Sequence, residues 1–78
     1  MNSGERLIAA QSRMDRAEEQ MEQARAVMKY AQEDVIAGAI TYSNYKKHCD
    51  YCYRRASELH QARRVYWQAY DVYHNEEI

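Results

Sequence analysis

The sequence predicts an all-α protein, an antiparallel two-helix coiled-coil hairpin that dimerises into a four-helix bundle. The 78 residues include no proline and only two glycines, which suits long helices and argues against a turn-rich β fold. Apolar residues recur every seven positions in both halves of the chain. The chain forms one small domain, residues 1–78, whose core is marginal alone unless the protein is oligomeric.

The first helix is expected over about residues 3–37. Asn2 or Ser3 can cap its start, and Glu5 follows Asn2 by three residues, as in a capping box. Two apolar strings run along it with the alternating three- and four-residue spacing of a coiled-coil seam. They are Leu7, Met14, Met21, Met28 and Val35, and Ala10, Ala17, Ala24, Ala31 and Gly38.

A turn over residues 38–41 leads to the second helix, expected over about residues 42–75. Gly38 can take the left-handed conformation that ends the first helix. Thr41 is the favoured N-cap of the second helix, with Ser43 as the alternative. The seam strings of this helix are Tyr42, Cys49, Ala56, Arg63 and Tyr70, and Tyr45, Cys52, Leu59, Tyr66 and Tyr73.

The two halves match as the facing sides of an antiparallel pair. In such a hairpin, the position numbers of facing residues add to a constant. Each residue of the two strings in the first helix has a facing residue in the second helix that gives the same total. Met21 with Leu59 and Ala24 with Ala56 are two such pairs. The implied turn is centred on residue 40, where the Gly38 break lies, so two independent signals predict the same hairpin.

The second helix has more apolar surface than one partner helix can cover. Beside its seam run Lys46, Tyr53, His60 and Trp67 on one flank, and His48, Arg55, Ala62 and Ala69 on the other. An exposed apolar patch of this kind marks another interface, either a homodimer or a heterologous partner. Tyrosine, tryptophan and arginine dominate the energetics of such interfaces. The candidate interface residues are Tyr53, His60, Trp67, Arg64, Tyr51 and Arg63.

Arg63 is expected in the seam, opposite Ala17. A charge there is costly unless it is paired, and Asp15, Glu18 or a carboxylate of a second subunit could accept it. A polar seam residue of this kind fixes helix register or the oligomeric state.

Basic doublets in the second helix raise the possibility of nucleic-acid binding through Lys47, Arg54 and Arg64. Helical spacing scatters each doublet over different faces, and the net charge is −1. A solvated charged face is therefore the favoured interpretation, and nucleic acid is the less favoured partner.

The stretch HCDYCYRR contains a CxxC pair, Cys49 and Cys52. Structural zinc needs four ligands, and His60 lies too far along the helix axis to join the pair within one chain. Zinc shared between two subunits is the alternative, but two small core thiols are favoured. We therefore expect no metal and no cofactor. No phosphate-binding loop or nucleophile motif is present, which predicts a protein that is not an enzyme and has no small-molecule substrate.

The sequence thus predicts a small dimeric regulatory or inhibitory module that binds a host or cognate protein through the aromatic side of the second helix. A nucleic-acid-binding dimer and a structural coiled-coil segment are the alternatives. In size and architecture the chain resembles the helical-hairpin accessory proteins that bacteria and their phages use to inhibit or recruit another protein. No apolar run spans a membrane and no signal peptide is evident, so a cytoplasmic location is expected.

Overall fold

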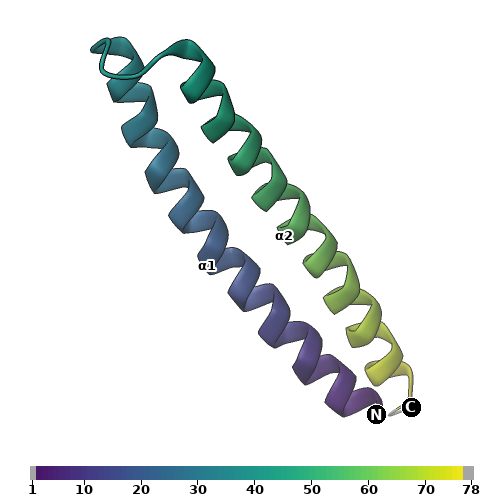
Figure 1. Ribbon diagram of the computed structural model, residues 1–78. Coiled ribbons are helices and arrows are strands. Elements are labelled where there is room, and N and C mark those ends of the chain that lie inside the picture. Colours follow the sequence, from purple (N-terminus) through teal and green to yellow (C-terminus); the bar gives the residue numbers. More distant parts are fainter. Residues whose placement is uncertain (1, 77–78) are drawn as a thin grey trace.

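Two long antiparallel helices lie side by side and form a rod (Figure 1). The computed structural model describes residues 2–76, with α1 over Ser3–Ile36 and α2 over Tyr42–Glu76. The rod measures 59 × 17 × 14 Å, and its radius of gyration is 17.4 Å, against about 12 Å for a globule of this length. The predicted helical hairpin is confirmed, while its pairing into a four-helix bundle stays a prediction. Residues 1, 77 and 78 of the expected domain lie outside the described residues.

Asn2 caps the start of α1. Its Oδ1 accepts a hydrogen bond of 2.8 Å from the backbone N–H of Glu5, and its Nδ2 donates to Glu5 Oε1 at 3.4 Å. One of the N–H groups that the first turn leaves without a helical partner is thereby satisfied. The capping residue is Asn2 rather than the alternative, Ser3.

The turn between the helices is built around Gly38, whose φ of 75° is in the left-handed region. The N–H of Gly38 donates to Val35 O at 3.2 Å, and the N–H of Ala39 donates to Asp34 O at 2.8 Å. These two bonds form a Schellman motif, which satisfies the last carbonyls of α1. Thr41 then caps α2, because its Oγ1 accepts from Asn44 N at 3.2 Å.

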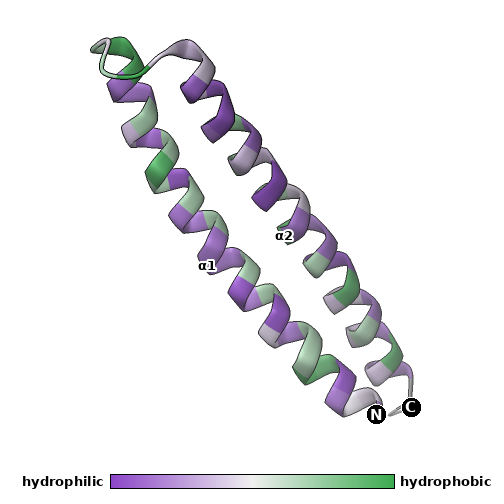
Figure 2. Ribbon diagram, viewed as in Figure 1, coloured by the Kyte–Doolittle hydropathy of each residue, from purple (hydrophilic) through white to green (hydrophobic). Residues whose placement is uncertain are grey.

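The alanine string of α1 forms its side of the seam. Four alanines at seven-residue intervals are buried along the helix, namely Ala10, Ala17, Ala24 and Ala31. Small side chains in these positions let the two helices approach closely. At mid-length, Ala17 and Met21 of α1 pack with Leu59 and Ala62 of α2 in one core cluster. The hydrophobic segments of α2 lie mostly in the half nearest the chain ends (Figure 2).

The seam of α2 differs from the prediction by a rotation of the helix. Ala62 is 1% exposed, whereas the Arg63 side chain is 53% exposed and Ala56 is exposed as well. Two strings of α2 have the three- and four-residue spacing that a seam shared with Leu59 requires. One of them contains Arg63 and the other contains Ala62. Burying Ala62 leaves the guanidinium of Arg63 in water and avoids a desolvation cost of several kcal/mol. The expectation that Arg63 lies in the seam is therefore wrong.

Candidate functional site

Five rings gather on α2 near the open end of the hairpin, where α1 begins and α2 ends. We call this the aromatic cluster, and its members are Tyr66, Trp67, Tyr70, Tyr73 and His74. The Trp67 ring centroid lies 5.2 Å from that of Tyr66 and 5.2 Å from that of Tyr70, both edge to face. Tyr70 and His74 rings are 4.1 Å apart. Such contacts favour a fixed arrangement of the rings, although Trp67 is still 55% exposed.

Helical spacing explains why these rings meet. Residues three and four positions apart are neighbours on a helix surface, which joins Trp67 to Tyr70 and Tyr70 to His74. Tyr66 and Tyr73 belong to the seam string and are partly buried. Their position in the seam anchors the cluster to the hairpin, since a Cβ placed on Gly4 of α1 would lie 3.6 Å from Tyr73 Cε2.

This cluster is not predicted by the seven-residue periodicity. The periodicity assigns the tyrosines at 66, 70 and 73 to the seam and places Trp67 in a string with Tyr53 and His60. Tyr53 and His60 are exposed on the same flank of α2, with Tyr53 at 76%, but they are about 20 and 10 Å, respectively, from Trp67 along the axis. The density of rings at positions 66, 67, 70, 73 and 74 was the signal that could have found the cluster.

Tyr51 lies on the opposite flank of α2, held by arginines. Arg55 Nε donates to the Tyr51 hydroxyl at 3.1 Å, and the guanidinium carbons of Arg55 and Arg54 lie 5.1 and 6.0 Å from the centroid of the Tyr51 ring. Arg55 Nη1 also donates to Glu58 at 2.8 Å and to Gln20 of α1 at 3.3 Å. The hydrogen bonds to Tyr51 and Glu58 raise the pKa of Arg55 above its ordinary value. Tyr51 therefore does not share a surface with Trp67.

Arg63 bridges the two helices at the surface. Its Nη2 lies 3.5 Å from Oε1 of Glu18, which was among the acceptors expected for it. The surrounding hollow, of about 430 Å³, is lined mainly by charged side chains, including Asp15 and Glu22 of α1. An exposed ion pair of this kind contributes little to stability.

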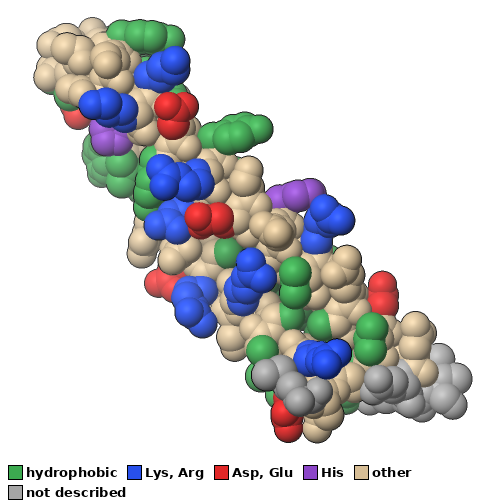
Figure 3. Space-filling view, turned by 45° about the vertical axis from the view of Figure 1, so that its right-hand side comes forward, with side chains coloured by type: hydrophobic (Ala, Val, Ile, Leu, Met, Phe, Trp, Pro, Cys, Tyr) green, Lys and Arg blue, Asp and Glu red, His purple; other side chains and the backbone are tan. Residues whose placement is uncertain are grey.

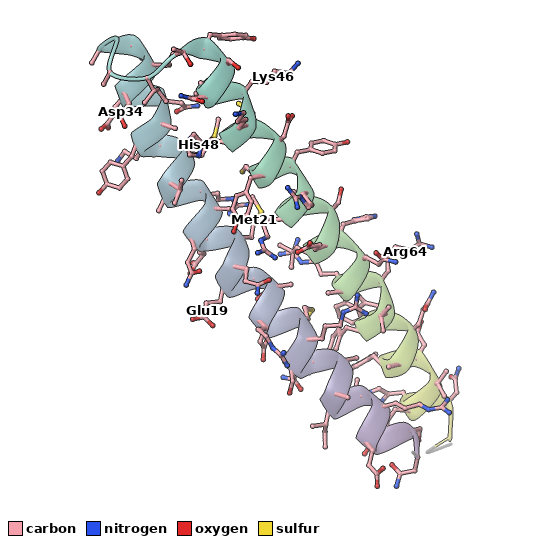
Figure 4. The ribbon with its side chains drawn as sticks, viewed as in Figure 1. Glu19, Met21, Asp34, Lys46, His48 and Arg64 are labelled. Carbon is pink, nitrogen blue, oxygen red and sulfur yellow. The ribbon has the colours of Figure 1, made fainter. Side chains whose placement is uncertain are left out.

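The basic residues considered for nucleic-acid contact are all exposed. These are Lys47, Arg54 and Arg64, and none of them is in an ion pair within residues 2–76. Arg64 points away from α1, as does Lys46 (Figure 4). Basic side chains are spread along the face shown in Figure 3, with acidic ones between them, rather than gathered in one patch.

Cys49 and Cys52 are unbonded thiols, both half-buried beside the seam. Cys52 packs against the core cluster, and His48 lies between the two helices (Figure 4). In the described part of the chain, no three side chains of histidine, cysteine, aspartate or glutamate are placed to hold a metal ion. The geometry around the CxxC is that of helix packing.

Comparison of the chain with protein-family models, with curated proteins and with solved structures gave no match in any of the three. Neither helix, over the residues described, is long and apolar enough to cross a membrane. Among the described residues, the aromatic cluster is the densest group of rings on the surface.

Proposed function

We propose that the protein is a small non-enzymatic interaction module that binds a target protein through the aromatic cluster on α2. The observation that supports this most directly is Trp67, which is 55% exposed while packed edge to face against Tyr66 and Tyr70. Large rings held by their neighbours lose little conformational freedom when a partner covers them, so burial contributes more to affinity. Tyrosine hydroxyls and the Trp67 indole N–H add hydrogen-bond donors at the rim.

We infer a regulatory or inhibitory role, in which the module covers a functional surface of its target. A rod of 9.3 kDa offers long faces and open hollows rather than an enclosed pocket. Such a shape suits occupation of a partner's surface better than conversion of a small molecule. We place the protein in the cytoplasm of a bacterial or phage-infected cell, where its two unbonded thiols would stay reduced.

The proposal is tested by affinity capture from the source cell with three baits: the wild-type protein, Trp67→Ala and Tyr42→Ala. Tyr42 is the matched control, because it is an exposed ring on the same helix at the opposite end of the rod. A true target is retained by the Tyr42→Ala bait and lost with the Trp67→Ala bait, while circular dichroism shows equal helicity for all three.

The target is then purified and its affinity measured directly by titration calorimetry. We expect Trp67→Ala to weaken binding about tenfold or more, as at an interface hot spot. Equal affinity of the wild-type and Trp67→Ala proteins for every captured partner would contradict the proposal.

Nucleic-acid binding is the second candidate, because Lys47, Arg54 and Arg64 are exposed cations outside any ion pair of the described residues. It predicts a mobility shift with DNA or RNA at low salt that weakens steeply as salt rises. Replacing the three cations with glutamine would remove that shift. The absence of any shift by the wild-type protein at low salt would eliminate this candidate.

A further inference from the structure

One side of the hairpin has an apolar hollow of about 450 Å³ near the open end. Its floor and walls include Ala9 and Ala10 of α1 and Val65, Ala69 and Val72 of α2. Both valines are exposed. A contiguous apolar hollow on so small a protein is the kind of surface that a partner covers.

The hollow belongs to a longer surface on the same side of the rod. Arg13 lines this hollow and also the next one, which contains Gln20 of α1 and Glu58 of α2. We call this side the groove face. Its α1 edge begins with Arg6 beside the first hollow.

The α1 edge of the groove face continues to the turn. The alanine string from Ala10 to Ala31 is buried along the whole seam, so residues of α1 seven positions apart have the same orientation relative to α2. The string that starts at Arg6 therefore remains on the groove face along the whole helix. Its members are Arg6, Arg13, Gln20, Val27 and Asp34. Asp34 lies near the turn end of α1 (Figure 4).

The α2 side of the groove face changes in size from one end to the other. Arg55, Ala62 and Ala69 follow one another at seven-residue intervals on α2, and all three are partly or fully buried. The two small alanines lie toward the open end, whereas the large Arg55 lies toward the turn. The adjacent exposed string contributes Val65 toward the open end and Tyr51 toward the turn. Hydrogen bonds from Arg55 to Gln20 and to Tyr51 place these larger side chains on the groove face.

Side-chain size on α1 changes in the same direction, because small Ala9 lies at the open end and large Tyr30 occupies the equivalent position three heptads later. The groove face is thus hollow in one half and built up in the other. A second copy running in the opposite direction would bring its built-up half onto the hollow half of the first. A copy running in the same direction would leave hollow against hollow.

Charge supports the same arrangement. Arg6 and Asp34 are 28 residues apart on one helix, about 42 Å, so they cannot pair within a chain. Neither is in an ion pair among residues 2–76. In an antiparallel two-fold pair of hairpins, Arg6 of each copy lies over Asp34 of the other, and the pair occurs twice.

The exposed area of the hairpin is sufficient for such an interface. Its accessible surface is 6057 Å², whereas a compact monomer of this mass exposes about 5,000 Å². The excess of roughly 1,000 Å² is comparable to the ~800 Å² that each partner buries in a standard stable interface.

We propose that the groove face binds a second copy of this chain, antiparallel and two-fold symmetric, with Arg6 of each copy paired to Asp34 of the other. The aromatic cluster stays outside this interface, because Trp67 is two residues from Val65 and so about 200° around the helix. The dimer then carries one aromatic cluster near each end. Given the proposed function, on which this last consequence rests, the dimer binds two target molecules about a rod length apart.

Charge reversal tests the pairing in the purified protein, with the dissociation constant of the dimer measured by sedimentation. Arg6→Glu and Asp34→Arg should each weaken the dimer roughly tenfold, because each places two like-charge contacts in the interface. The double variant should return to near the wild-type value. Both changes suit the helix dipole, with an acid in the first turns and a base in the last, so helicity should persist. Arg25→Glu, at the charged hollow around Arg63 and outside the groove face, is the matched control and should leave the dimer unchanged.

Cysteine cross-linking tests the orientation. With Cys49 and Cys52 replaced by alanine, a chain carrying both Arg6→Cys and Asp34→Cys should oxidise to a covalent dimer, and each single variant should not. Cross-linking by Arg6→Cys alone would show a parallel pair and overturn the proposal. A monomeric wild-type protein at all concentrations, or a double charge reversal no tighter than the single ones, would overturn it too. None of these measurements involves the target, and Trp67→Ala should leave the dimer intact, so the two proposals fail separately.

Discussion

Arg63 Nη2 lies 3.5 Å from Glu18 Oε1, at the surface between α2 and α1. The preceding residue, Ala62, is 1% exposed in the core. One residue corresponds to about 100° of helix rotation, so this single step separates a buried alanine from a solvated arginine. The rotation of α2 about its own axis sets the face that packs on α1 and the face that remains for partners.

Two glutamine substitutions test the rotation of α2. Arg63→Gln should change the free energy of unfolding by less than about 1 kcal/mol, because an exposed ion pair contributes little. Ala62→Gln should cost more than about 2 kcal/mol, since a larger polar side chain must enter a packed site. Urea titrations followed by circular dichroism at matched protein concentration measure both. A greater loss for Arg63→Gln than for Ala62→Gln would mean that Arg63, and not Ala62, faces α1.

Leu59 is the large buried side chain of α2 in the core cluster. Leu59→Ala should destabilise the protein by about 2–5 kcal/mol, through lost burial and the cavity left behind. Ile36→Ala is the control, because Ile36 is 86% exposed at the end of α1 and should change stability by no more than about 0.5 kcal/mol. Similar urea midpoints for the two variants would argue against the core cluster.

Gly38 should resist replacement more than Gly4 does. Gly38→Ala places a Cβ on a residue with φ of 75°, and we expect a loss of roughly 1 kcal/mol although no atom lies within 4 Å of that Cβ. Gly4→Ala, inside α1, meets only ordinary contacts at 3.5 and 3.6 Å and should be neutral or stabilising. Thermal unfolding midpoints compare the two, and an unchanged midpoint for Gly38→Ala would contradict the left-handed turn.

Arg55 should not be replaceable by lysine. Its guanidinium donates to Tyr51, Glu58 and Gln20 at once, a geometry that a lysine ammonium on a flexible stem cannot reproduce. Arg55→Lys should therefore lower the urea midpoint, whereas Arg54→Lys at the neighbouring exposed position should not. Equal midpoints for the two variants would show that these contacts do not stabilise the hairpin.

Much of the fold was predictable from local and periodic signals. Asn2, Gly38 and Thr41 act within a few residues of themselves, so their roles as caps and turn follow from residue type and position. The inward side of α1 was equally predictable, because only one pair of strings on that helix is apolar throughout and has the spacing of a seam. The exposure of Tyr53, His60 and Trp67 was also anticipated, although their role in binding stays a prediction.

By itself, the sequence determined that two helices form, where they turn, and which side of α1 faces inward, since caps and seven-residue periodicity act along one helix at a time. Only the tertiary structure decided which side of α2 meets that surface. Two strings of α2 fit the seam equally well by spacing, and the choice follows from packing Ala62 against α1 while Arg63 stays hydrated. That rotation also leaves Trp67 exposed on one flank and opens the groove face on the other, because both surfaces are defined relative to the helix across the seam.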